Sequence, residues 1–165
     1  QVTREEQTIL IGQIRDKVPN IAIRTTMLVG FPGETDEEFE DLCDFVREIQ
    51  FERLGVFTYS HEESTSAHQY EDNIPDEIKH ERAQILMGIQ EEISFEKNSQ
   101  KVGQIFKVLI DRKESGNYVG RTEFDSPEVD NEVLIPTKGN YLRIGDFAQI
   151  EIVDATEFDL YGEPA

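Results

Sequence analysis

The chain has 165 residues, enough for one ordinary domain or two small ones, and its 35 acidic and 16 basic residues give a formal net charge of −19. Such a surface repels nucleic-acid phosphates and attracts basic partners, although acidity can also serve solubility alone. No apolar run approaches the ~20 residues that a membrane span needs, so no membrane segment is expected.

The first part of the chain shows helical periodicity interrupted by two short apolar runs. Helices are expected over residues 4–18, 36–49 and 76–97, and strands over 21–30 and 52–60. The apolar side of the third helix is expected to hold Ile78, Ile85, Leu86, Ile89 and Ile93. The order helix–strand–helix–strand–helix is typical of a parallel α/β sheet or barrel. Two strands are too few to complete either, so further strands are expected upstream in a longer protein.

After about residue 99 the pattern changes to alternation and turns. Short strands are expected within residues 104–113, 117–124, 132–136, 147–155 and 157–162. Five such strands predict a small antiparallel barrel of the OB-like kind. The fold class is therefore α/β followed by all-β, with domains over residues 1–98 and 99–165.

The sharpest local signal is the turn Gly30–Glu34, which directly follows the first expected strand. Thr35 and Glu38 then form a capping-box pattern, which satisfies the helix N–H groups that a phosphate would otherwise occupy. Two glycines permit either a tight structural turn or the close approach of a flat ligand to the backbone. The turn lies at the carboxyl end of a strand, the edge of a parallel α/β fold that holds active sites.

Three other features have a functional and a structural interpretation. The loop over residues 61–68 contains two His and two Glu and is either a metal site or, because the spacing is irregular, an unliganded polar loop. Arg24 interrupts an apolar strand, so it either faces a carboxylate inside a barrel or pairs with a neighbouring Glu. Cys43 is expected to be a packed core thiol, and a single cysteine favours the reducing cytoplasm.

Four segments together resemble the radical-SAM methylthiotransferase family: RTTMLVGFPGETDEEFEDL, RLGVFTYSHEES, GRTEFDSPEVDNEVLIP and EFDLYGE. The resemblance extends over residues 4–163 and is strongest to the branch that modifies an aspartate of a small-subunit ribosomal protein. It implies the last part of a TIM-like radical-SAM barrel, with two strands and three helices, followed by a TRAM domain. The family uses S-adenosylmethionine and 4Fe-4S clusters. The CxxxCxxC motif that binds the catalytic cluster is absent, so this chain alone is expected to be inactive.

The resemblance also implies which residues lie near the cofactor, because the strand ending in GFPGE belongs to the barrel that encloses S-adenosylmethionine. The expected neighbours are Arg24, Gly30, Pro32, Gly33, Glu34, Tyr59 and Ser60. They define a neighbourhood, without assigned contacts.

The charge of residues 101–165 bears on the substrate. This segment contains seven Lys or Arg and 13 Asp or Glu, which favours a basic ribosomal protein as the partner. A tRNA-modifying, MiaB-like enzyme would need a basic face, and a non-enzymatic acidic adaptor would not need the GFPGE turn. The expected substrate-binding residues are Arg121, Asp125, Glu128 and Asp130. Unpaired strand edges within residues 21–30 or 52–60 also predict self-association.

Overall fold

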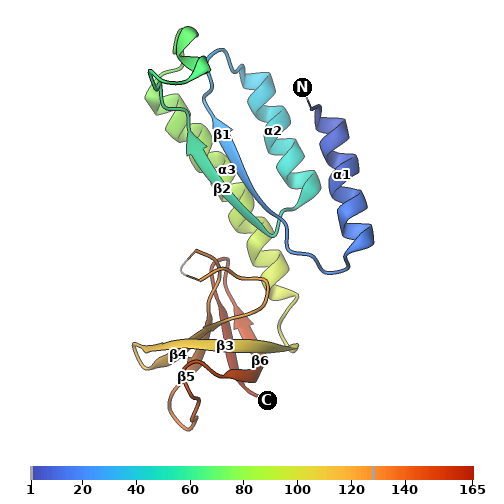
Figure 1. Cartoon of the computed structure of the whole chain (residues 1–165), viewed down its shortest axis with the longest axis vertical. Helices are drawn as coiled ribbons and strands as arrows, with labels where there is room; N and C mark the ends of the chain where they lie inside the picture. The colour runs from blue at the N-terminus through green and yellow to red at the C-terminus, as the bar shows by residue number, and fades with distance from the viewer. Residues whose placement is uncertain (1, 128) are drawn as a thin grey trace. The chain divides into compact units, whose positions relative to one another are not determined.

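The computed structural model describes residues 2–127 and 129–165, and the chain divides into two compact units, residues 1–90 and 91–165 (Figure 1). The elements are α1 (Arg4–Lys17), β1 (Arg24–Val29), α2 (Asp36–Ile49), β2 (Arg53–Thr58), the short 3-10 helix η1 (Ser66–Gln69), α3 (Asp76–Ser99), β3 (Ile105–Glu114), β4 (Asn117–Arg121), β5 (Val133–Pro136), β6 (Phe147–Ala155) and β7 (Leu160–Pro164). The expected α/β part followed by an all-β part is confirmed. Across the described residues, no helix is both long and apolar enough to cross a membrane.

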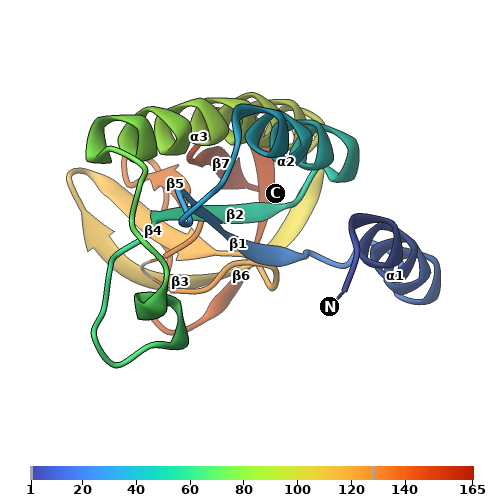
Figure 2. The same cartoon turned by 90° about the horizontal axis from the view of Figure 1, so that it is seen from above.

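The first unit is built on a two-stranded parallel sheet of β1 and β2. On one face, Met27 and Leu54 pack against a buried cluster that includes Phe45 of α2. Figure 2 shows α2 and α3 on the same side of this sheet. Leu28 and Phe57 are register partners on the opposite face, and they remain 48% and 62% exposed. One sheet face is therefore covered by helices and the other is open.

Helix α2 begins with the predicted capping box. The Thr35 hydroxyl accepts the N–H of Glu38 at 3.2 Å, and the Glu38 carboxylate accepts the N–H of Thr35 at 2.9 Å. The helix ends before Gln50, which adopts a left-handed conformation with φ 53°. Its buried residues are Cys43, Phe45, Val46 and Ile49. Local caps at both ends thus fix the length of the helix that follows the GFPGE turn.

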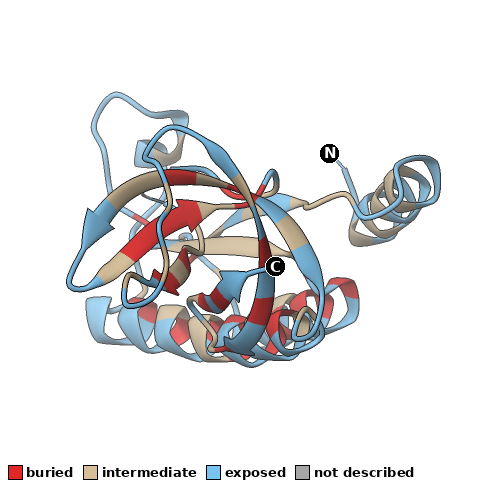
Figure 3. Cartoon of the chain, turned by 90° about the horizontal axis from the view of Figure 1, so that it is seen from below, coloured by how far each residue is buried: buried red, intermediate tan, exposed pale blue. Residues whose placement is uncertain are grey.

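The second unit is a closed barrel with the strand order β3-β4-β5-β7-β6. The pair β5–β7 is parallel and the other four pairs are antiparallel, so the expected all-antiparallel barrel is wrong in this detail. The reason is geometric, because a ring of five strands cannot alternate direction all the way round. The strand sequences alternate as a small barrel requires: Ile150 and Ile152 are buried, whereas Gln149 and Glu151 face outward. Figure 3 shows buried positions along these strands.

Candidate functional site

The turn Gly30–Glu34 directly follows β1 and depends on two glycines with positive φ, 73° at Gly30 and 87° at Gly33. Their surroundings differ. A Cβ atom at Gly30 would lie 3.0 Å from the Cβ of Lys79 and closer still to its Cγ, whereas a Cβ at Gly33 would meet nothing within 4 Å. Gly30 is therefore required by packing, and the α-carbon of Gly33 faces open space.

The side chain of Glu34 is hydrogen-bonded to the backbone of its own turn. Its carboxylate accepts the N–H of Gly30 at 3.0 Å and a hydrogen bond from Nη1 of Arg82 at 2.6 Å. Nη2 of Arg82 donates to Asp36 at 2.7 Å. Burial lowers the pKa of Arg82, but the hydrogen bond to Asp36 and the charge of Glu34 outweigh it, so its pKa is raised. The Glu34 carboxylate is thus engaged within the protein.

Lys79 packs over the same turn from α3. Its side chain is only 4% exposed, and its Nζ lies 2.7 Å from Asp72 and 3.2 Å from Asp76. Burial lowers the pKa of Lys79, but the hydrogen bonds to both carboxylates prevail and the pKa is raised. The same Nζ lies 5.5 Å from the ring centre of Tyr59. Lys79 therefore links the turn to the segment that follows β2.

Tyr59 lies directly beside the turn. Its N–H donates to the carbonyl of Val29 at 2.9 Å, and its ring meets that of Phe31 edge-on at 5.3 Å. The hydroxyl lies 3.1 Å from Nδ1 of His61. The neighbouring Ser60 is exposed, and its hydroxyl donates to Glu62 at 2.7 Å. Of the expected cofactor neighbours, Gly30, Pro32, Gly33, Glu34 and Tyr59 thus form one group with Ser60 at its margin.

Arg24 lies apart from this group. It is the first residue of β1, and at a rise of about 3.3 Å per residue it is roughly 20 Å from the Gly30 end of that strand. It is exposed and shares the open face of the sheet with Leu28. Both alternatives for Arg24, a carboxylate inside a barrel or a neighbouring Glu, stay predictions, because the sheet of this unit has only the two strands β1 and β2.

The polar loop over residues 61–68 and Cys43 were the other candidate features. The rings of His61 and His68 lie with their centres 4.3 Å apart and are tilted by 38°, but no group of three or more His, Cys, Asp or Glu among the described residues is arranged to hold a metal ion. Cys43 is buried in α2, and burial raises the pKa of its thiol. A single cysteine cannot hold an iron–sulfur cluster by itself, because such a cluster needs several thiolate ligands.

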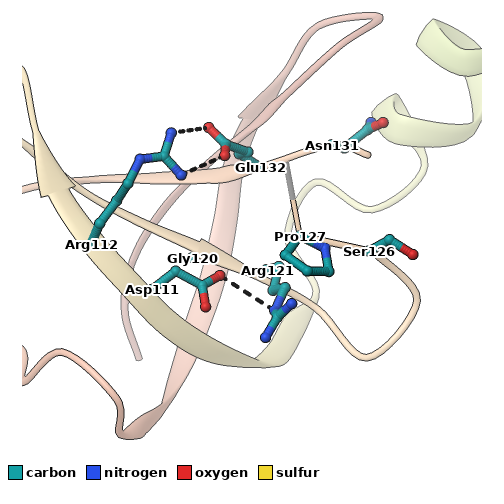
Figure 4. Close-up of a pocket in the computed structure, with 8 residues that line it drawn as sticks. All are labelled: Asp111, Arg112, Gly120, Arg121, Ser126, Pro127, Asn131 and Glu132. Carbon is teal, nitrogen blue, oxygen red and sulfur yellow. Dashed lines mark hydrogen bonds and ion pairs between the residues drawn. The ribbon is translucent and has the colours of Figure 1, made fainter. Parts of the chain in front are cut away.

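In the barrel, a cavity of about 170 Å³ lies beside the loop that follows β4 (Figure 4). The guanidinium of Arg112 forms a bidentate ion pair with the carboxylate of Glu132, with N–O distances of 2.7 and 2.9 Å. Nε of Arg121 lies 3.3 Å from a carboxylate oxygen of Asp111. The hydrogen bond to Glu132 is the main reason that the pKa of Arg112 is raised. The charges that line this cavity are therefore paired with one another, and Arg121 is held in its wall.

The acidic loop expected to bind substrate is also internally engaged. Asp125 is 8% exposed and accepts the Thr122 hydroxyl at 2.5 Å. Asp130 accepts the N–H of Ser126 at 2.7 Å. Glu128 lies outside the described residues. Asp125 and Asp130 thus stabilise the loop itself.

Carboxylates that sequence inspection did not single out are available on the outer face of β6 and β7. Glu151 and Glu163 are both exposed and lie directly opposite each other across the antiparallel pair. Like charges in this position destabilise a sheet, and a cation placed between them relieves the repulsion. The sequence could have predicted that both residues face outward, because they alternate with apolar neighbours. That they lie opposite each other follows only from the strand register in the structure. Lys79 and Arg82 were also missed, because a cation in a helix is usually solvated.

Comparison with known proteins agrees with this architecture. Residues 102–164 match the TRAM domain family. Three similar relatives are each described as "Ribosomal protein uS12 methylthiotransferase RimO". The protein of Cytophaga hutchinsonii is 58% identical over 162 residues, which cover 98% of this chain and 37% of the relative. Those of Flavobacterium psychrophilum and Bacteroides fragilis are each 55% identical over 163 residues, covering 99% and 98% of this chain and 38% of each relative. The family resemblance is thereby confirmed, and the chain spans less than two fifths of the curated relatives' length.

Proposed function

We propose that this chain is part of a radical-SAM methylthiotransferase that modifies an aspartate of the small-subunit ribosomal protein uS12 in the cytoplasm. The observation that carries the proposal is the identity of 52–58% to RimO proteins over nearly the whole chain. In this proposal the TRAM domain binds the protein substrate, and the first unit supplies part of the wall that encloses S-adenosylmethionine.

In this proposal S-adenosylmethionine contacts the backbone of the turn and not the carboxylate of Glu34. The open side of Gly33 and the partly exposed ring of Phe31 suit a flat ligand, whereas Glu34 is occupied by Arg82 and Gly30. S-adenosylmethionine would supply the radical when a 4Fe-4S cluster reduces it. Those clusters would be held by residues outside this chain, so the chain alone is inactive.

The surface charge favours a basic protein over tRNA as the substrate. On the outer face of the barrel, the register places Glu151 directly opposite Glu163 across the β6–β7 pair. A basic segment of uS12 gains electrostatic energy at this position, whereas a phosphate backbone loses it. The tRNA-adenosine enzyme is the alternative that this arrangement disfavours.

The test is a titration of the 165-residue chain with purified uS12 and with unmodified tRNA, each at low and moderate salt. The double variant E151Q/E163Q removes the proposed docking charges, and D16N/E91Q removes two exposed charges elsewhere as the matched control. We expect the docking variant to raise the Kd for uS12 about fivefold at low salt, equivalent to about 1 kcal/mol, and the control to leave it unchanged. A saturable preference for tRNA would refute the proposed substrate.

A further inference from the structure

Helix α3 places two buried cations, Lys79 and Arg82, three residues apart over the GFPGE turn. Their side chains are 4% and 7% exposed. Removing a cation from water is costly unless it is paired, and each of these is paired with two carboxylates. The partners are Asp72 and Asp76 for Lys79, and Glu34 and Asp36 for Arg82. Cations on a solvated helix face would not need such paired carboxylates, so the burial and pairing of Lys79 and Arg82 indicate a specific role at the turn.

Arg82 acts on the turn through a chain of two hydrogen bonds. Its guanidinium holds one oxygen of Glu34 at 2.6 Å, and the same oxygen accepts the N–H of Gly30 at 3.0 Å. Glu34 is only 13% exposed, so without Arg82 its charge would be left poorly solvated and unpaired. The backbone at Gly30 therefore depends on a cation contributed by a distant helix.

Lys79 acts through two separable parts of its side chain. The aliphatic stem occupies the space next to Gly30 that a Cβ would need. The ammonium group binds Asp72, which belongs to the loop between β2 and α3. The stem thus shapes the turn, and the charge attaches the loop to it.

We infer that Lys79 and Arg82 are positioning residues that set the conformation of the turn and, through it, the surface offered to S-adenosylmethionine. The identity of this ligand rests on the proposed function. The dependence of the turn on the two cations rests only on the contacts above, so two separate measurements distinguish the two claims.

The first measurement is amide hydrogen exchange in the 165-residue chain, followed at Gly30 and at Val46 in the core of α2. R82Q is expected to speed exchange at Gly30 about tenfold or more without the same change at Val46, because only a local hydrogen bond is lost. R82K should restore part of the protection, and R47Q, which alters an exposed cation on α2, should change neither amide. Equal acceleration at Gly30 and Val46 would show a merely global destabilisation and overturn the inference.

The second measurement is S-adenosylmethionine binding by equilibrium dialysis to the full-length protein that carries this chain. We expect R82Q and K79A to weaken binding about tenfold or more, and K79M, which keeps the stem, to weaken it less. Wild-type binding with unchanged affinity in R82Q would refute the role of Arg82 in positioning the ligand. No binding by the wild-type protein would refute the proposed function, while the exchange result would still decide whether the cations hold the turn.

Discussion

The contrast between Gly30 and Gly33 gives the sharpest stability prediction. Both residues have positive φ, so alanine at either position incurs about 1–2 kcal/mol from the left-handed conformation. Only at Gly30 does the new Cβ also overlap the stem of Lys79, which adds about 1–3 kcal/mol of overpacking. We therefore expect G30A to lower the free energy of unfolding by about 2–5 kcal/mol and G33A by about 1–2 kcal/mol.

The assay is urea unfolding followed by circular dichroism at 222 nm, because the described α-helices all lie between Arg4 and Ser99. If the overlap is the cause, G30A should be less harmful in a K79A background, by about 1–2 kcal/mol of coupling. Equal losses for G30A and G33A, or no coupling to Lys79, would refute the packing argument.

Three further predictions concern other parts of the chain. D125A should lower the unfolding free energy of the barrel by about 1–3 kcal/mol because a buried hydrogen bond to Thr122 is lost. An unchanged thermal midpoint of unfolding would contradict this structural role of Asp125. Since burial raises the pKa of Cys43 above its ordinary 9.0, its contribution to stability is present below that pH and lost as the pH rises above it. The difference in unfolding free energy between wild type and C43A should therefore shrink between pH 8 and pH 10, and a constant difference would contradict this. At about 100 µM, sedimentation should show self-association that L28S/F57S reduces, whereas a monomeric wild type would count against an associating open sheet face.

Local signals in the sequence predicted the helix start and the barrel strands well. The capping box at Thr35 and Glu38 is complete within four residues, so no distant contact was needed to recognise it. Strand β6 has the predicted bounds, because alternation from Gln149 to Ile152 identifies it even though the register with β7 shifts between Ile152 and Asp154. The parallel β5–β7 pair was also accessible in principle, because closure of five strands demands one.

Contacts between distant residues were not predictable in the same way. Arg82 meets Glu34 across 48 positions, and nothing in the helix pattern indicates that partner. Periodicity correctly placed Leu86, Ile89 and Ile93 on the buried side of α3. It also placed Ile78 and Ile85 there, which are exposed, and it gave no sign that Lys79 is buried. Helical periodicity identifies buried positions from apolar side chains alone. It therefore does not predict the burial of a cation whose desolvation is offset by carboxylates from other segments of the chain.

The same limit applies to the charge argument for the substrate, because a count treats every carboxylate as available. In the barrel, Asp125 and Asp130 are hydrogen-bonded within their loop and Glu132 is paired with Arg112, so these acids contribute little to docking. In the proposed docking surface, the like-charged pair of Glu151 and Glu163 is the feature expected to favour a basic protein over tRNA. Neutralising both should weaken binding of a basic protein and strengthen any binding of tRNA to this face, because the same charges attract one and repel the other. Opposite signs of the two effects in E151Q/E163Q would identify the outer face of β6 and β7 as a protein-docking surface, and a weakening for both ligands would show that the face acts through something other than charge.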